Sequence, residues 1–130
     1  ESSYKERAQQ RLYELQDKLI LTEYLSAKLY YNLGEYFGNC INGGSNYEAC
    51  IVTAENTLKT YPFTSMREDF YLLIMKSKFE LAEQSVEEKR IDRYREAEDE
   101  CYGFINEFPE SKDRATAEKY IAKCKKVTGD

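Results

Sequence analysis

The feature that most constrains the fold is an internal repeat marked by the chain's two prolines. Pro62 follows residues 58–61 (LKTY) and Pro109 follows residues 105–108 (INEF), so an aromatic residue precedes each proline at an offset of 47. An apolar stripe with helical spacing recurs at this offset. It pairs Tyr47 with Tyr94, Cys50 with Ala97, Ala54 with Cys101, Leu58 with Ile105 and Tyr61 with Phe108. Each stripe predicts the buried face of a helix that ends at the aromatic-proline pair.

The segment before the first stripe carries a known repeat signature. Residues 30–37 (YYNLGEYF) match the aromatic-x2-Leu-Gly-x2-aromatic pattern of the first helix of a tetratricopeptide repeat, with tyrosine in place of tryptophan. We expect Gly34 to let the second helix approach closely. We expect Tyr30, Leu33 and Phe37 to fill the space between the two helices.

The small-residue position of the second helix in such a repeat lies twelve residues before its proline, and Cys50 and Ala97 occupy it here. The sequence therefore predicts an all-α fold of tetratricopeptide-like helical repeats, with units longer than the ordinary repeat of about 34 residues.

The two ends of the chain resemble each other. Residues 1–8 (ESSYKERA) are similar to 110–115 (ESKDRA), and an offset of 109 pairs Ala8 with Ala117, Leu12 with Ile121 and Leu15 with Cys124. Glu1 then corresponds to the residue after a proline, and we expect any targeting segment to lie upstream or to have been removed. We predict one helical-repeat domain over 1–130, made of a half repeat 1–22, units 23–62 and 63–109, and a half repeat 110–130.

Five helices follow from the patterns, over residues 4–36 (long or slightly broken), 46–60, 66–86, 91–107 and 112–127. A serine three residues before a glutamate is the start signal of a capping box. This spacing occurs at Ser3, Ser45 and Ser65, just before three of the predicted helices. Residues 42–44 (NGG) form the loop before the second helix.

Composition excludes several classes of function. The chain has no histidine, which removes Ser-His-Asp and Cys-His catalysis and histidine-based zinc sites, so we expect no enzyme and no cofactor. Its net charge of −5 disfavours nucleic acid as a partner. No uncharged run approaches the roughly 20 apolar residues of a membrane span. The acidic run at 96–100 is expected to be a solvated helix face.

The four cysteines fit no metal or redox spacing. Cys50 and Cys101 fall on the apolar stripes, where a free cysteine behaves as a small hydrophobe. We therefore expect free thiols and no metal site, with a Cys40–Cys50 link across the glycine loop as the one locally plausible disulfide.

Four segments together resemble a known family: 25–36 (LSAKLYYNLGEY), 58–62 (LKTYP), 82–89 (AEQSVEEK) and 108–111 (FPES). They are similar to the BamD family, the tetratricopeptide lipoproteins of the outer-membrane β-barrel assembly machinery in Gram-negative bacteria. The resemblance covers essentially the whole chain and corresponds to the C-terminal half of the family. It implies a non-catalytic scaffold on the periplasmic side of the outer membrane, tethered only through a lipid anchor upstream of Glu1.

In that family the C-terminal repeats dock the POTRA domains of the barrel-inserting subunit, and other assembly subunits are further partners. Some members present an arginine from the second helix of the matching repeat, where this chain has Thr53. The candidate partner-binding residues along this helix and the following turn are Glu48, Thr53, Asn56, Lys59, Arg67 and Asp69. The alternative is another periplasmic tetratricopeptide-repeat module that binds proteins of the cell envelope.

Overall fold

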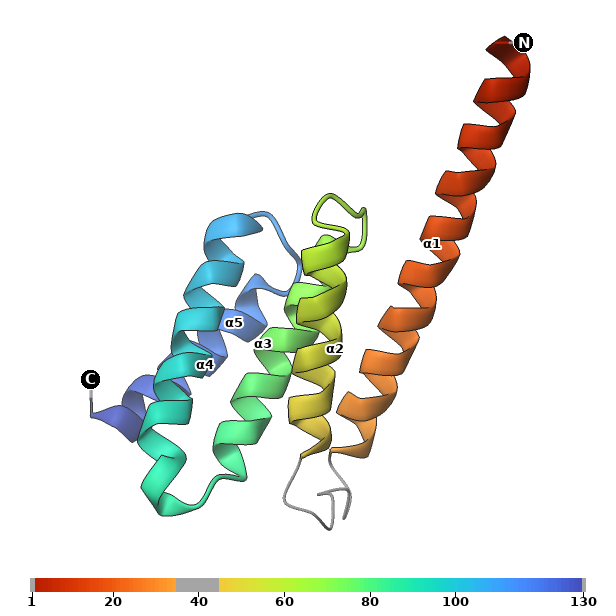
Figure 1. Ribbon diagram of the computed structural model, residues 1–130. Helices are drawn as coiled ribbons and strands as arrows, with labels where there is room; N and C mark the ends of the chain where they lie inside the picture. The colour runs from red at the N-terminus through yellow and green to blue at the C-terminus, as the bar shows by residue number, and fades with distance from the viewer. Residues whose placement is uncertain (1, 35–44, 130) are drawn as a thin grey trace.

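The computed structural model describes residues 2–34 and 45–129, and over these residues the chain is helical (Figure 1). The helices are α1 (Ser2–Leu33), α2 (Asn46–Thr60), α3 (Arg67–Glu83), α4 (Glu87–Glu107) and α5 (Arg114–Thr128). The predicted all-α fold of helical repeats is confirmed.

Each helix packs against the next one along the chain, and α1 also contacts α3. In Figure 1, α2 and α4 lie on one side of the array, with α3 and α5 behind them. The N-terminal half of α1 extends well beyond the other helices. Its residues 3–19 are exposed, apart from the half-buried Gln16.

Helix boundaries differ from the prediction most clearly between α3 and α4. The first of these helices ends at Glu83 and the second begins at Glu87, earlier than the predicted 86 and 91. The backbone N–H of Ser85 donates to the carbonyl of Ala82 at 3.2 Å, which closes a tight turn. Glu87 and Glu88 then fall in the first turn of α4, where carboxylates interact favourably with the helix dipole.

The capping serines have three different outcomes. Ser45 caps α2 by accepting a hydrogen bond from the backbone N–H of Tyr47 at 3.1 Å, at the second helical residue rather than the third. Ser3 lies inside α1, so it is not a cap. Ser65 is not the cap of α3 either: Met66 holds that position, and Thr64 Oγ1 accepts from the Met66 N–H at 3.2 Å.

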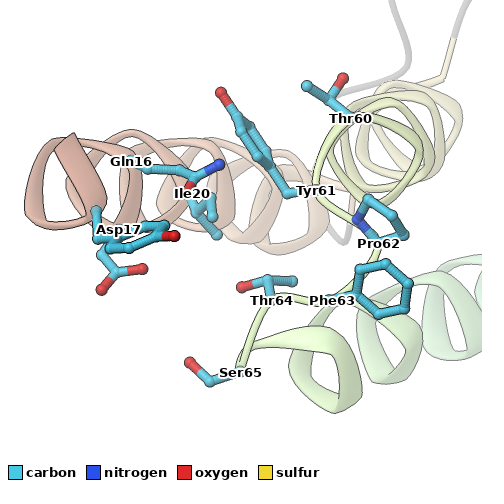
Figure 2. A pocket seen from close by; sticks show the side chains of 10 residues that line it. Gln16, Asp17, Ile20, Thr60, Tyr61, Pro62, Phe63, Thr64 and Ser65 are labelled. Carbon is cyan, nitrogen blue, oxygen red and sulfur yellow. The ribbon is translucent and has the colours of Figure 1, made fainter. Parts of the chain in front are cut away.

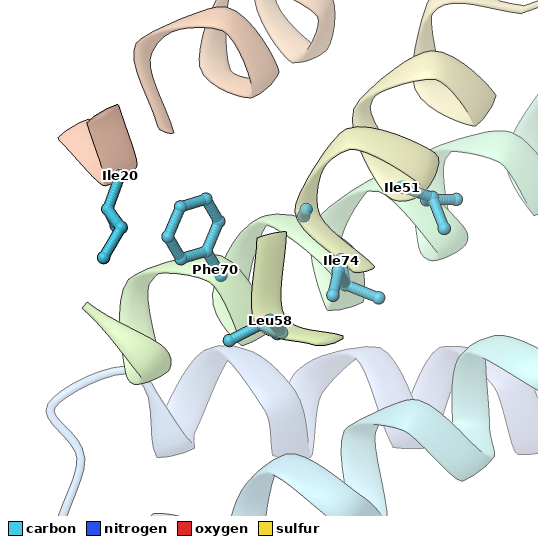
Figure 3. Close-up of a cluster of buried hydrophobic side chains, with 6 residues drawn as sticks. Ile20, Ile51, Leu58, Phe70 and Ile74 are labelled. Atoms are coloured by element: carbon cyan, nitrogen blue, oxygen red, sulfur yellow. The ribbon is translucent and has the colours of Figure 1, made fainter. Parts of the chain in front are cut away.

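The core follows the two repeated stripes. Fully buried positions of α2 and α4 are Tyr47, Cys50, Ala54, Tyr94, Ala97 and Cys101, and Leu58 is 7% exposed. Leu58 packs with Ile20, Ile51, Phe70 and Ile74 where α1, α2 and α3 meet (Figure 3). The end of each stripe is less enclosed, since Tyr61, Ile105 and Phe108 are half-buried and Pro62 and Pro109 are exposed.

The contact between α1 and α2 depends on Gly34. A Cβ at Gly34 would lie 2.5 Å from the Tyr47 ring, so only glycine fits this position without displacing the ring. Ala27 is fully buried and Tyr31 half-buried on the same face. Tyr30 and Leu33, predicted to fill this space, are instead 36% and 41% exposed, because the buried face runs through 27, 31 and 34. Phe37 lies outside the described residues.

The cysteines that the structure describes are buried free thiols, namely Cys50, Cys101 and Cys124. Burial raises the pKa of Cys101 to about 12 and that of Cys124 to about 11, and it raises the pKa of Cys50 as well. They therefore behave as small apolar core residues. Cys40, and with it the alternative Cys40–Cys50 link, lies outside the described residues, as does the 42–44 loop.

Candidate functional site

The two aromatic-proline turns have the same backbone geometry. At the α2–α3 turn (residues 61–66), Tyr61 ends the helix with φ −127° and ψ 67°, and at the α4–α5 turn (residues 108–113), Phe108 has φ −126° and ψ 63°. In both turns, the arginine five residues after the proline donates a hydrogen bond to the carbonyl of that proline. Arg67 donates to Pro62 at 2.9 Å, and Arg114 donates to Pro109 at 3.2 Å. The internal repeat therefore extends to the hydrogen bonds of the turns.

What differs is the residue after each proline. Phe63 is 97% exposed in the α2–α3 turn, whereas Glu110 occupies the matching position of the α4–α5 turn. Among the large hydrophobic side chains that the structure describes, Phe63 is the most exposed, so its ring gains nothing from burial in the folded chain. The α2–α3 turn is accordingly the surface feature that points most directly to a partner.

A hollow lies on the α1 side of this turn, and we call it the α1 cleft (Figure 2). It has a volume of about 500 Å³. One wall comes from α1 and the other from the end of α2 and the turn. The lining residues are Tyr13, Gln16, Asp17, Ile20, Thr60, Tyr61, Pro62, Phe63, Thr64 and Ser65. The cleft therefore combines aromatic and hydroxyl groups with one carboxylate, that of Asp17.

A second hollow of about 340 Å³ lies on the opposite side of Pro62, between α2 and α4 over α3, and we call it the α4 groove. Its lining residues are Glu55, Leu58, Lys59, Pro62, Arg67, Tyr71, Ile74 and Glu100. Since Pro62 lines both hollows, the α2–α3 turn forms a ridge between them.

Ion pairs hold the walls of the α4 groove in place. Arg67 pairs with Glu107 of α4 and lies 4.9 Å from the centre of the Tyr71 ring. The Lys78 ammonium lies 2.8 Å from a Glu100 carboxylate oxygen. Burial alone would lower the pKa of Lys78, but the hydrogen bond to Glu100 and the charges of Glu100 and Glu55 raise it. Lys78 therefore stays charged and is already engaged by acids of the groove.

The six predicted partner-binding residues do not form one site. Lys59 and Arg67 line the α4 groove. Glu48 pairs with Arg93 of α4 at 3.6 Å. Asp69 lies towards α1, where its charge adds to burial in raising the pKa of Tyr24. Thr53 and Asn56 lie three residues apart on another side of α2 and line neither hollow.

The residue that the predicted set lacks is Phe63. Its position directly after a proline, in a turn between two apolar stripes, gives it no helical register and hence no predicted burial. The sequence signal that could have pointed to Phe63 is that it is an aromatic residue in a turn, outside both apolar stripes. Two more aromatic residues of the cleft lie outside the predicted partner-binding set: Tyr61, which was predicted to pack in the repeat, and Tyr13, which is 57% exposed.

The thiols of the described residues are buried with raised pKa values. Among residues 2–34 and 45–129, no group of three His, Cys, Asp or Glu side chains is placed to hold a metal ion. Within that part of the chain, no helix has the length and apolar character needed to cross a membrane. What the arrangement offers is an exposed aromatic side chain at the α1 cleft, on the turn that separates this cleft from the α4 groove.

Comparison of the chain with protein-family models and with curated proteins found no match.

Proposed function

We propose that this chain is a non-catalytic, protein-binding helical-repeat scaffold that docks its partner through the α2–α3 turn. The observation that carries the proposal is the 97% exposure of Phe63. The turn that presents Phe63 is fixed by the Thr64 N–H bond to the Tyr61 carbonyl at 3.2 Å and by the Arg67 bond to Pro62. A turn whose backbone is already ordered loses little backbone entropy when it binds.

Phe63 has the character of an interface anchor. Aromatic side chains dominate interface energetics, and an anchor contributes most when surrounding contacts exclude water from it. Phe63 lines the α1 cleft, and its neighbour Pro62 also lines the α4 groove, so both hollows adjoin the turn and would accept the rim of a partner's surface. Asp17 in one hollow and Lys59 in the other offer opposite charges for orienting that partner.

We further propose that the partner is a POTRA domain of the barrel-inserting subunit, and that the protein acts on the periplasmic side of the outer membrane of a Gram-negative bacterium. The support is the resemblance of segments 25–36, 58–62, 82–89 and 108–111 to the BamD family. One of these segments ends at Pro62, directly before Phe63, so the resemblance and the exposed aromatic converge on the same turn.

The test is an isothermal titration calorimetry experiment in which purified POTRA domains are titrated into the full chain at concentrations up to about 100 μM. We expect micromolar binding that falls at least tenfold in Phe63→Glu, because the variant places a charge where an apolar pocket is required. Glu110→Lys, at the matching position of the other turn, is the control and should bind like the parent chain.

Three results are decisive. Absence of binding by the parent chain would rule out the POTRA assignment. Binding that survives Phe63→Glu would rule out the α2–α3 turn as the docking site. Binding of a different envelope protein that is lost in Phe63→Glu, with no binding of POTRA domains, would favour the alternative periplasmic module.

A further inference from the structure

The N-terminal half of α1 carries an apolar stripe that nothing in the described chain covers. Leu12, Leu15 and Leu19 are 65%, 57% and 57% exposed, and Ala8 continues the same helical spacing. We call these four residues the outer stripe. This half of α1 projects beyond the helical array in Figure 1, so no neighbouring helix shields it.

The outer stripe matches the buried face of α5. At the offset of 109, Ala8, Leu12 and Leu15 correspond to Ala117, Ile121 and Cys124. Those three α5 residues are buried, and their clusters contain the α4 residues Tyr94, Ala97, Cys101 and Phe104. The same clusters also contain Met75, Phe79 and Ala82 of α3, so α3 and α4 cover this face together. The part of the cover that α4 supplies is an aromatic-small-small-aromatic stripe.

Charge around the outer stripe is mostly basic. Lys5, Arg11 and Lys18 each lie three or four residues from a stripe member, and so they flank it on the helix surface. Of the four acids of α1, Glu6, Glu14 and Asp17 have no such neighbour in the stripe, and Glu23 has one, Leu19, four residues before it. Asp17 lines the α1 cleft instead, on a different side of the helix. The face thus joins apolar residues to three bases and to one acid, Glu23, which lies at the end of the stripe nearest the helical array.

The pair formed by α4 and α5 has the same complementarity. The run 96–100 of α4 contains four acids, and no base follows Arg95 in that helix. The facing helix α5 carries five bases against one acid, Glu118. An acidic helix with small and aromatic stripe residues therefore packs on a basic one.

We propose that the outer stripe of α1 docks an amphipathic helix of α4 chemistry, with an aromatic-small-small-aromatic stripe and an acidic flank. A second copy of the chain does not supply this partner, because its own α4 stripe is buried under α5. Antiparallel pairing of two α1 helices would set basic flanks such as Arg11 and Lys18 against each other. This docking site is separate from the α2–α3 turn and does not rest on the proposed function.

The probe is a fluorescently labelled peptide of residues 87–107, the sequence of α4, with blocked ends. Titrated with the full chain, it should bind with micromolar affinity. Leu12→Asp and Leu15→Asp should each weaken binding at least tenfold. Leu21→Asp is the matched control: Leu21 is also exposed, at 47%, but it lies outside the stripe, and the variant should bind like the parent chain.

Because an isolated 21-residue peptide is only partly helical, a fusion tests the same contact intramolecularly. Residues 87–109 placed directly before Glu1 reproduce the α4, proline and α5 order of the natural chain. The fusion should unfold at a higher temperature than the parent, and Leu15→Asp should remove that gain.

No peptide binding together with no gain in the fusion would overturn the proposal. Peptide binding that is insensitive to Leu12→Asp and Leu15→Asp would overturn it as well. So would concentration-dependent dimerisation of the parent chain, in analytical ultracentrifugation, that Leu12→Asp abolishes, since a second copy would then be the occupant.

Discussion

The α2–α3 and α4–α5 turns are built alike and present different chemistry to solvent. Each turn begins with a half-buried aromatic residue whose backbone N–H donates a hydrogen bond at 2.8 Å to the carbonyl four residues earlier. In each turn an arginine donates to the carbonyl of the proline. Yet one exposes Phe63 and the other Glu110. The residues that set the backbone are therefore separate from the one that faces a partner, and each turn serves as a control for the other.

The two helices that lead into the turns give the largest expected effect. Tyr47→Ala and Tyr94→Ala should each lower the free energy of unfolding by about 3 to 5 kcal/mol, because both rings are fully buried at equivalent positions. Urea denaturation of the purified variants measures this. Tyr102→Ala, at a 44% exposed site of α4, should cost less than about 1 kcal/mol. A large loss for only one of the two buried tyrosines would break the equivalence of the repeats.

The two stripes also differ at one buried position, where α2 has Ala54 and α4 has Cys101. Because only the cysteine can ionise, this difference predicts that the free energy of unfolding depends on pH. Burial raises the pKa of Cys101 to about 12 in the folded chain, while a thiol in the unfolded chain titrates near 8.5. The unfolded state alone loses its proton as the pH rises between these values, so stability falls. We expect a loss of about 2 kcal/mol from this group between pH 8 and pH 10, measured by urea denaturation at each pH.

Cys101→Ala is the control for the pH effect. It should reduce the loss at pH 10 and leave the remainder to Cys124, whose pKa is about 11, and to the other thiols. The same pH dependence in the parent chain and in Cys101→Ala would contradict the assignment of a buried, neutral thiol to this position.

The two arginines that close the turns should differ by a smaller amount. Arg67→Ala should cost about 1 to 2 kcal/mol, since Arg67 also pairs with Glu107 and lies over the Tyr71 ring. Arg114 adds only a 3.8 Å pair with Glu118 within its own helix, so Arg114→Ala should cost less than about 1 kcal/mol. Thermal denaturation of both variants compares them, and equal losses would show that the turn bond alone matters.

The smallest effect is expected where the turns differ. Phe63→Glu and Glu110→Phe should each change the free energy of unfolding by less than about 0.5 kcal/mol, because both positions are exposed. If Phe63→Glu lowers the free energy of unfolding by more than about 1 kcal/mol, Phe63 is a structural residue. Its exposure would then no longer support a binding site at the turn.

Much of the fold was predictable because repetition supplies the same signal twice. The stripes ending at Pro62 and Pro109 located α2 and α4, and the glycine signature located the close contact of Gly34 with Tyr47. The face of α1 was harder. The leucines of α1 occur on all sides of the helix, so periodicity alone does not separate the buried side, with Ala27, from the exposed side, with Leu33.

The candidate site was less predictable than the fold. Lys59 and Arg67 were singled out as lying along the second predicted helix and the following turn, and both line the α4 groove. Glu48 and Asp69 were singled out on the same ground, but the structure directs them to α4 and α1. Where a polar side chain points depends on which neighbours pack around its helix, and a single sequence does not contain that information.

The central claim is that the α2–α3 turn binds a partner and the α4–α5 turn does not. The most direct measurement is the amide NMR spectrum of the isotopically labelled full chain, recorded while unlabelled POTRA domains are added. We predict shifts or line broadening concentrated at residues 59–67, with residues 106–114 unchanged. Perturbation of both turns to the same degree, or of 106–114 alone, would contradict the claim.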